Sequence, residues 1–449
     1  MNHAILDHLR AQRERHLRDL ATFVRMPTIA GTGEGVRETA DWLVAFMRRI
    51  GIEPIVDEDA NWPVILAEIP GASERSLLVY GHYDVQPADE PEWRYPAFGA
   101  EIHDGRMYGR GTVDDKGPVM AVLEAIRAYR EAGVTPPVTI KLLIEGEEEV
   151  SSPSLRPVLE RHRDFLDSDG LVNYDDNVWS DGRPRIVCGL KGSVGIRLSV
   201  TTRREYHAMF ASLLTNAIWR LHAALATIAD ADGRITIDGF FDDVVPPSEA
   251  ELRALVELNW TGRELLEESG QRAFVGGREG LEALRHYILE PSFNLQGIEG
   301  GYVTPRKKSV VPHHAVAEIR FGTVPNQTGE RIHELLSAHL ARRGFDDVAV
   351  ELYSQNPWAR TPIESRLATA LRRSLDDAFE RGVAVQPSYA GSGPEGIFQE
   401  LFPAMEQAYS GFGPTENNLH APNEYIIVDD YLRGIESFAR LVHYYGEET

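Results

Sequence analysis

Apolar residues in the first third of the chain follow the two periods of regular secondary structure. Helical spacing of apolar residues among charged ones marks the segments 4–25 and 37–50. Continuous apolar runs with the length of strands occupy residues 64–69, 76–85 and 138–146. Residues 119–133, between the last two runs, form a helical pattern that stops at Gly133. A strand, a helix and a second strand in this order predict an α/β sheet.

The pattern changes in the middle of the chain and changes back near residue 361. Long helical patterns and strand-like runs are mixed there, at residues 211–228, 309–328, 329–345 and 348–353. Such a mixture is typical of an α+β domain. From residue 361 onwards, helical segments and short strands alternate again. We therefore predict an α/β protein whose main domain is split into residues 1–198 and 357–449 by an inserted α+β block at 199–356.

The composition of the chain limits the partners that it can have. There are 46 Lys and Arg residues against 69 Asp and Glu, and the formal net charge is −23, which argues against nucleic acid or an anionic membrane as the main partner. Cys188 is the single cysteine, so no internal disulfide can form, which fits a reducing compartment or a protein that needs no disulfide for stability. The charged N-terminal stretch lacks the apolar core of a signal peptide, and no apolar run is long enough to span a bilayer. We therefore expect a cytoplasmic protein.

A first candidate site motif, GHYDVQP at residues 81–87, follows a strong strand pattern. His82 and Asp84 are two residues apart, so on an extended backbone their side chains project to the same side. Sites in open α/β sheets are built at strand ends, and a carboxylate is a natural partner for a metal-bound histidine. Taken alone, a strand-end turn with a surface histidine is the more frequent meaning of such a motif.

The motif GRGTVDDKG at residues 109–117 places Asp114 and Asp115 directly before a helix. One aspartate would be explained as the N-cap, since Asp favours that position and the positive end of a helix. The second aspartate has no such explanation, whereas a carboxylate that bridges two cations would account for it.

Three further polar motifs follow strands or lie in loops: EGEEE at 145–149, VNYDDNVW at 172–179 and NNLHAPNE at 417–424. Separately they fit a solvated acidic turn, an Asx turn and a solvated histidine. Together with the first two motifs they supply carboxylates and two histidines, a ligand set that suits two zinc-like cations. A two-metal site also needs a bridging carboxylate and a base for the shared water.

In their order and spacing these motifs resemble the dinuclear zinc exopeptidases, the family of carnosine dipeptidases, glutamate carboxypeptidases, aminoacylases and succinyl-diaminopimelate desuccinylase. The resemblance runs nearly from end to end of the chain. It is closest to the dipeptidase branch, of which HYDVQP at 82–87 and GRGTVDDKGP at 109–118 are typical. It implies a catalytic domain with a mixed sheet flanked by helices, and it makes the inserted block at 199–356 a lid and dimerisation domain.

The resemblance implies a pair of divalent metal ions, zinc first, with manganese or cobalt as alternatives. The ligands that it implies are His82, Asp114, Glu149, Asp176 and His420. His82 and Asp176 would bind one ion and Asp114 would bridge both, which leaves the other two ligands for the second ion. Asp84 would orient His82, and the peptide bond between the paired aspartates would be cis.

The implied function is hydrolysis of an amide or peptide bond in a small dipeptide-like or N-acyl amino acid substrate. A water activated by two zinc ions would attack the carbonyl, with Glu148 as general base and then general acid. Glu147, the variable position of the acidic run, is expected to be exposed or just outside the metal ligands. His207 matches the lid histidine that stabilises the oxyanion, often from the other subunit, so a homodimer is expected.

Two departures from the family pattern concern substrate recognition. After His207, the usual Ser-Gly is replaced by larger residues, up to position 212. The position of a family arginine that clamps the substrate carboxylate is Gly322, and Arg320 lies two residues earlier, where it could reach the pocket or be a solvated edge residue. The loop that includes Gly391, Ser392 and Gly393 resembles the family's carboxylate-binding loop loosely. We infer that the metal machinery is intact while substrate recognition has shifted.

Two other hypotheses keep the same fold and metal site. One is a pseudoenzyme that binds metal without turnover, which the altered lid favours and the complete set of ligands and base opposes. The other is an altered reaction, such as amide formation or cleavage of another bond, which the sequence does not separate from hydrolysis.

Overall fold

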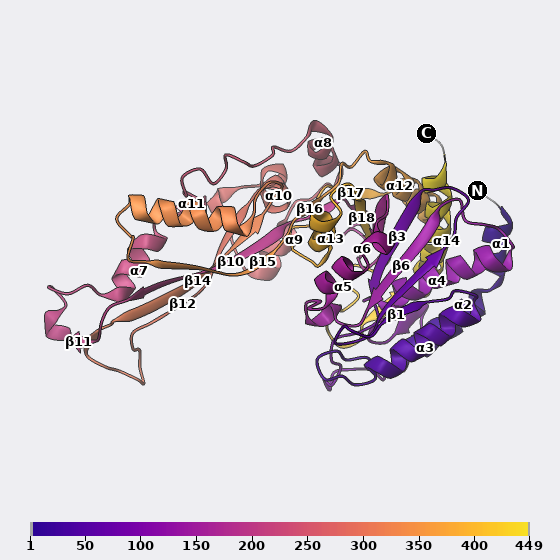
Figure 1. The fold of residues 1–449 in the computed structure, drawn as a ribbon, viewed down its shortest axis with the longest axis horizontal. Helices are drawn as coiled ribbons and strands as arrows, with labels where there is room; N and C mark the ends of the chain where they lie inside the picture. The colour runs from indigo at the N-terminus through magenta and orange to yellow at the C-terminus, as the bar shows by residue number, and fades with distance from the viewer. Residues whose placement is uncertain (1–2, 448–449) are drawn as a thin grey trace. The chain divides into compact units, whose positions relative to one another are not determined.

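The computed structural model describes residues 3–447, which form two units (Figure 1). Unit 1 extends to Gly189, resumes from Thr361 to Gln386 and continues from Ile397. Unit 2 consists of Leu190–Arg360 together with Pro387–Gly396. A chain that leaves a domain and returns to it is the organisation expected from the change of pattern along the sequence.

The observed division differs in detail from the boundaries at 198/199 and 356/357. The chain enters unit 2 at Leu190 because strand β10 (Gly192–Thr201) pairs along its whole length with β14 (His314–Thr323) inside that unit. The segment 387–396, which the sequence pattern had assigned to the main domain, also belongs to unit 2. Strand pairing between distant segments decides these boundaries, and local hydrophobicity does not reveal it.

Unit 1 is built on a mixed sheet of eight strands, as predicted. In spatial order the strands are β1 (Ile55–Asp57), β2 (Val64–Ile69), β6 (Thr139–Glu145), β3 (Ser76–His82), β7 (Gly170–Asn173), β18 (Glu406–Gly411), β8 (Arg185–Val187) and β17 (Ala384–Gln386). β3 is parallel to both of its neighbours, β6 and β7, and Figure 1 shows β3 beside β6. Every residue of β3 is buried, as expected for a central strand covered on both faces.

Helices flank this sheet and form the main core with it. They are α1 (His3–Ala11), α2 (Arg13–Val24), α3 (Val36–Arg49), α4 (Lys116–Glu131), α5 (Leu155–Arg161), α6 (Arg163–Leu166), α12 (Arg366–Phe379) and α14 (Val428–Gly446). A small sheet of β19 (Tyr425–Ile427), β5 (Arg106–Tyr108) and β4 (Glu101–His103) completes the unit. Helix α13 (Glu395–Leu401) and strands β9 (Gly189–Leu190) and β16 (Ala359–Arg360) lie at the divisions between the units. Within residues 3–447, no helix is both long and apolar enough to cross a bilayer.

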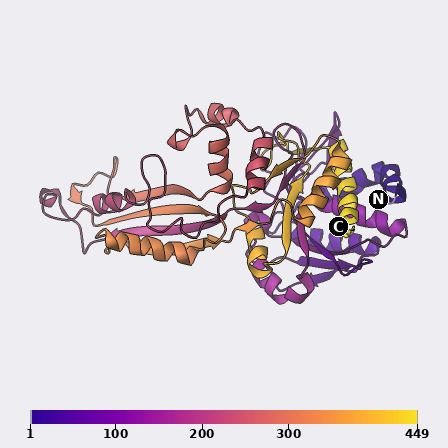
Figure 2. The same cartoon turned by 90° about the horizontal axis from the view of Figure 1, so that it is seen from above.

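Unit 2 contains a four-stranded antiparallel sheet in the order β12 (Ser292–Gly300), β14, β10 and β15 (Ala349–Asn356). Its other elements are β11 (Tyr206–His207), β13 (Val310–Val311), α7 (Ala217–Leu225), α8 (Glu249–Glu257), α9 (Arg263–Ser269), α10 (Gly280–Leu289) and α11 (Gly329–Arg342). Alternate residues of β14 are buried in a second core, which they share with α7 and α11, and Figure 2 shows α11 running along the strands. This alternation is the pattern of a sheet with one covered face.

Two predicted helices differ from the observed ones. The amphipathic segment 4–25 is interrupted at Gln12 and forms α1 and α2. The long apolar segment 211–228 is helical only over α7, because Asn216 caps its start by accepting the backbone N–H groups of Ile218 and Trp219. Helical periodicity therefore predicted the presence of these helices better than their ends.

Candidate metal centre

Five segments that carry the candidate ligands converge in unit 1. His82 ends β3, and the carboxylates of Asp175 and Glu149 follow the neighbouring parallel strands β7 and β6. The carboxyl ends of parallel strands meet at one edge of a sheet, so these side chains come together there. Asp114 directly precedes the N-terminal turn of α4, and His420 lies in the loop before β19.

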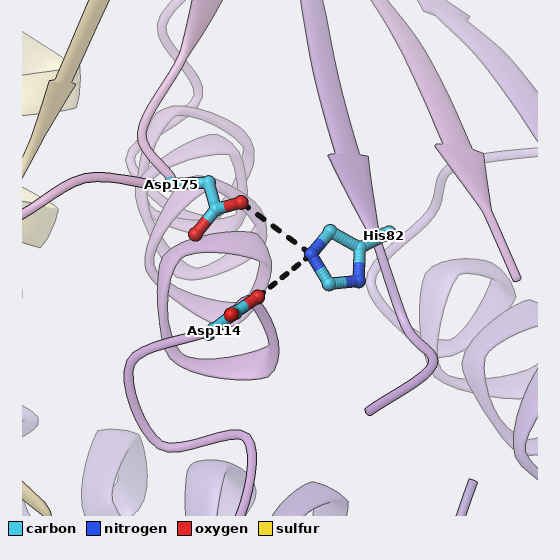
Figure 3. Close-up of side chains that lie close together, drawn as sticks. All are labelled: His82, Asp114 and Asp175. Atoms are coloured by element: carbon cyan, nitrogen blue, oxygen red, sulfur yellow. Dashed lines mark ion pairs between the residues drawn. The ribbon is translucent and has the colours of Figure 1, made fainter. Parts of the chain in front are cut away.

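The first group of potential ligands is His82, Asp114 and Asp175 (Figure 3). The Nε2 atom of His82 lies 2.9 Å from Asp114 Oδ1 and 3.5 Å from Asp175 Oδ2. Figure 3 shows the imidazole ring directed towards both carboxylates. One nitrogen and two carboxylate oxygens therefore face a common point.

The second group is Asp114, Glu149 and His420. The Nε2 atom of His420 lies 2.9 Å from Asp114 Oδ2 and 3.2 Å from Glu149 Oε2. Asp114 thus belongs to both groups and presents one oxygen to each histidine. This is the geometry that a carboxylate bridging two cations requires.

The donor atoms fit divalent cations better than they fit one another. His82 Nε2 and Asp114 Oδ1 are buried and close, yet neither forms a well-aligned hydrogen bond. Burial tends to lower the pKa of His82, but the carboxylates of Asp114, Asp175 and Asp84 outweigh it and raise that pKa well above its usual value. Asp114 and Glu149 raise the pKa of His420 to about 10. The site thus favours positive charge, and imidazole nitrogens with carboxylate oxygens are a zinc-type ligand set.

The predicted metal ligand Asp176 faces Arg185, and not His82, in this structure. Asp176 forms an ion pair with Arg185, whose Nε donates to Asp176 Oδ2 over 3.0 Å. The neighbouring Asp175 faces His82 instead, and its backbone N–H donates to Asn173 Oδ1. Consecutive residues point to different sides of the chain, so a shift by one residue exchanges the ligand for a residue that binds an arginine.

Asp84 is placed to orient His82 and to hold the acidic turn. Its Oδ1 atom lies 3.3 Å from His82 Nδ1, and its carboxylate accepts the backbone N–H groups of Glu148 and Glu149 over 3.2 and 3.1 Å. Asp84 is fully buried, so these bonds replace its lost hydration. The role of Asp84 towards His82 stays a prediction, and its bonds to the turn hold Glu148 one residue from the candidate ligand Glu149.

Gln86 is a candidate site residue that the sequence pattern did not single out. Its side-chain Nε2 donates to Glu149 Oε2 over 2.8 Å, and its backbone N–H donates to Glu149 Oε1 over 3.1 Å. Both oxygens of the ligand carboxylate are therefore oriented by one residue. The place of Gln86 in the GHYDVQP motif is the sequence signal that could have identified it.

The three consecutive glutamates at 147–149 lie in three different environments. Glu147 is buried and accepts a hydrogen bond of 2.7 Å from Asn61 Nδ2, so of the two expected positions, exposed or just outside the metal ligands, the exposed one is excluded. Glu148 is half-buried at the start of a short 3₁₀ turn, Glu148–Val150. Glu149 faces His420. Only the third of these carboxylates belongs to a ligand group within residues 3–447.

The Asp114–Asp115 peptide bond is cis, as predicted. Asp115 is the N-cap residue of α4, but its side chain makes no capping bond. Its Oδ2 atom instead accepts the backbone N–H of His82 over 3.0 Å. Burial, followed by the nearby charge of Asp175, raises the pKa of Asp115 well above its usual value. Neither aspartate therefore serves as the simple cap that was the alternative explanation of the pair.

Comparison with known proteins agrees with this arrangement of potential metal ligands. The sequence pattern of Peptidase family M20/M25/M40 matches residues 78–444. The chain belongs to this family. The match confirms the predicted family and its hydrolase activity of the metallopeptidase type. The matched residues extend over both units of this M20 peptidase.

Several relatives of this M20 peptidase are dipeptidases by name. The Beta-Ala-His dipeptidase of Rattus norvegicus is 28% identical over 392 residues, which cover 84% of this chain and 78% of that protein. A Cys-Gly metallodipeptidase of Candida albicans is 26% identical over 421 residues, covering 89% of this chain and 86% of that protein. The predicted place in the dipeptidase branch is consistent with both.

Solved structures share the fold over nearly the whole chain. An M20 family metallo-carboxypeptidase from Sulfolobus solfataricus has a TM-score of 0.82 at 32% identity, covering 96% of this chain and 99% of that one. Human carnosine dipeptidase 1 has a TM-score of 0.72 at 24% identity, covering 98% of each chain. The second likeness shows the fold alone. Together they confirm the predicted mixed α/β architecture.

The remaining predicted site residues of the M20 peptidase lie in unit 2. His207 is exposed at the end of β11, and its Nδ1 accepts the backbone N–H of Met209 over 3.2 Å. Arg320 donates from Nη1 to Ser193 Oγ over 2.6 Å. In the loop of Gly391, Ser392 and Gly393, the carbonyl of Gly391 accepts the backbone N–H of Lys191 over 3.1 Å. Their roles towards substrate stay predictions.

Replacing each of the two neighbouring aspartates separately by asparagine tests which of them binds a metal ion. Asp175→Asn is expected to weaken cation binding at one site by about 10–100-fold, because an amide oxygen replaces a carboxylate. Asp176→Asn is expected to leave both affinities unchanged and to lower the free energy of unfolding by about 1–3 kcal/mol, because Arg185 loses its charged partner. Metal content after dialysis against graded chelator and a urea titration measure the two effects. The reverse pattern would restore Asp176 as the ligand.

Proposed function

We propose that this peptidase hydrolyses an amide or peptide bond in a small dipeptide-like or N-acyl amino acid substrate, with two divalent cations and Glu148 as the general base. The observation that carries the proposal is the double role of Asp114, whose two oxygens face His82 and His420 at 2.9 Å each. The names of the dipeptidase relatives support the substrate class. Zinc is the proposed cation, because both groups combine imidazole with carboxylate ligands.

The protein supplies the base and its support. When bound, two divalent cations would acidify a water and polarise the carbonyl oxygen of the scissile bond. Glu148 is next to the ligand Glu149, and its backbone N–H is bonded to Asp84. In the proposed reaction its carboxylate takes the proton of the attacking water and then donates it to the leaving nitrogen. That second transfer matters, because an amine leaves readily only after it is protonated.

Metal analysis together with a substrate panel tests this proposal. Purified protein is expected to contain about two divalent cations per chain and to hydrolyse members of a panel of dipeptides and N-acyl amino acids. Prolonged chelation is expected to abolish hydrolysis, and added zinc, manganese or cobalt to restore it. Protein that holds no cation after purification without chelator, or that hydrolyses no amide in the panel with each metal added, contradicts the proposal.

Substrate recognition is proposed to depart from the usual free carboxylate. A Cβ atom at Gly322 would lie 2.4 Å from Ser292 Oγ, so this position holds no side chain without displacing that serine. Arg320 is on the same strand two residues earlier, and it reaches Ser193, the cross-strand partner of Gly322. This geometry supports Arg320 as the proposed contact to substrate. Its guanidinium would extend from a position two residues before that of the family arginine.

Dipeptides and their C-terminal amides separate the two modes of recognition. The proposed shift predicts that amides, or N-acyl compounds without the usual terminal carboxylate, reach a kcat/KM at least comparable to that of ordinary dipeptides. Steady-state kinetics on matched acid and amide pairs measures the ratio directly. A strong preference for ordinary dipeptides with a free carboxylate would show that the shift does not exist.

A homodimer is proposed to form through unit 2. Strand β12 is at the edge of its sheet and leaves one side of its backbone unpaired. Its apolar residues Leu295 and Ile298 are 40% and 55% exposed, which is unusual for an edge that faces water. The exposed Trp219 of α7, a helix that packs on the same sheet, adds apolar surface. A second copy pairing with this edge would cover both the backbone and these side chains.

Ile298→Lys is expected to convert the dimer into a monomer, because a charge on an edge strand opposes pairing. Light scattering after gel filtration measures the mass. Val256→Lys is the matched control, since Val256 on α8 is 58% exposed and lies on no strand. We expect the control to stay dimeric. A monomeric wild-type protein, or equal masses of the wild type and the Ile298 variant, would contradict this interface.

A further inference from the structure

A buried ion pair lies between the ligand loops of unit 1. Arg110 Nη1 donates to Glu424 Oε2 over 2.8 Å, and the two side chains are 1% and 0% exposed. Removing both charges from water is costly, so such a pair adds little to stability compared with apolar residues of the same volume. Burial raises the pKa of Glu424, which the charge of Arg110 opposes.

Glu424 binds the backbone of the loop that leads to Asp114. Its Oε1 atom accepts the N–H groups of Gly111 and Val113, both over 3.0 Å. Its own carbonyl accepts the N–H of Gly109 over 2.9 Å. Three backbone groups in the five residues before Asp114 are thus bound to one residue, which itself lies four positions after His420 in the sequence. The ligand shared by both metal groups and a ligand of the second group are joined by this contact.

Arg110 extends the connection to a third loop. Its Nη2 atom donates to the carbonyl of Pro87 over 3.3 Å. Pro87 ends the GHYDVQP motif, which also contains His82 and Gln86. The planar guanidinium can donate in two directions at once, whereas an ammonium group is a single point charge. One ion pair therefore links the loops that carry His82, Asp114 and His420.

We propose that Arg110 and Glu424 are a positioning pair that sets the relative placement of these three loops, so that Asp114 faces both histidines. Neither side chain is proposed as a ligand, since the guanidinium and the carboxylate bind each other and backbone groups, with Arg110 Nε left without a hydrogen-bond partner among residues 3–447. The proposal rests on the proposed two-cation function. It makes cation affinity, and not only folding stability, depend on this buried pair.

The same unit offers a matched control. Glu124 on α4 is also fully buried and lies 2.7 Å from His16 Nδ1, with Arg127 at 3.2 Å. This cluster joins α2 to α4 and contacts none of the ligand loops through the bonds described for residues 3–447. Glu124→Gln and Glu424→Gln therefore make the same chemical change in equally buried carboxylates, and only the second change is at the loops.

The experiment measures cobalt binding to the full chain. Metal-free protein is titrated with Co²⁺ in competition with a chromophoric chelator, the d–d absorption of the bound ion is recorded, and Tm is measured without metal. Glu424→Gln is expected to weaken binding by about 10–100-fold and to alter the absorption spectrum. Glu124→Gln is expected to lower Tm and to keep the wild-type affinity and spectrum. Arg110→Lys, which keeps the charge and loses one direction of donation, is expected to show an intermediate loss of affinity.

Each outcome decides between positioning and plain stability. Wild-type affinity and spectrum in Glu424→Gln, with a fall in Tm like that of Glu124→Gln, would overturn the positioning role. If Glu424→Gln does not fold, Arg110→Lys decides in the same way, since unchanged cobalt binding in that variant overturns the proposal. A wild-type protein that binds no Co²⁺ would refute the proposed function and, with it, this role. Tight wild-type binding with unaffected variants refutes the positioning role alone.

Discussion

Glu148→Gln is expected to lower kcat by about 10²–10⁴-fold while the protein keeps both cations. The amide has nearly the same shape as the carboxylate but takes no proton from water at neutral pH. The backbone N–H of Glu148 would still bond to Asp84, so the turn that presents the ligand Glu149 is retained. Metal analysis and steady-state kinetics on one preparation separate loss of the base from loss of the site.

The neighbouring Glu147→Gln is the matched control for this experiment. Glu147 is buried against Asn61 Nδ2 and belongs to neither ligand group. We expect a small decrease in stability and a kcat within a few-fold of the wild-type value. If Glu148→Gln retained more than a tenth of the wild-type kcat, another group would have to be the general base.

Asp114→Asn is expected to have the largest effect on the metal centre. Each carboxylate oxygen of Asp114 faces a different histidine, whereas an asparagine offers one oxygen and one NH₂ group. The variant is therefore expected to lose at least one of two cations and to fall to background hydrolysis. Metal content after dialysis and kcat/KM on the best substrate measure the change.

A control with the same loss of charge is available on the surface of unit 1. Asp181→Asn removes a carboxylate that is 44% exposed and paired with Arg183, away from both ligand groups. It is expected to keep metal content and activity, because exposed pairs contribute little. Two tightly bound cations in Asp114→Asn would exclude the bridging role and would leave the two groups as independent sites.

Local pattern predicted the strands and the position of the site well. The apolar run at 64–69 coincides with β2, and the runs at 76–85 and 138–146 contain β3 and β6. These strands are central and buried, so burial leaves a continuous apolar signature that needs no knowledge of the partner strand. Polar motifs directly follow β3 and β6, and the parallel arrangement of these two strands brings His82 and Glu149 to one edge.

Local pattern failed where distant contacts decide. The segment 387–396 belongs to unit 2 although its flanks belong to unit 1, and nothing in its composition reveals this. Asp175 and Asp176 both fit the same motif, and only the positions of Arg185 and His82 in space separate the carboxylate that faces His82 from the one that forms the ion pair. Buried glutamates such as Glu147 and Glu424 look solvated in sequence, because their partners are far along the chain.

The family, the α/β class and the residue types of the candidate metal centre follow from the amino-acid sequence, since these depend on periodicity and on motifs whose members are close together in the chain. The three-dimensional structure was needed to show that Asp175 faces His82, to find Gln86 beside Glu149, and to place Arg110 with Glu424 between the loops. Carboxylates act through the atoms they face across space, over 2.8 Å for Arg110 and Glu424, which are 314 residues apart in sequence. Spacing along the chain does not determine such contacts, because they form only when the strands have paired.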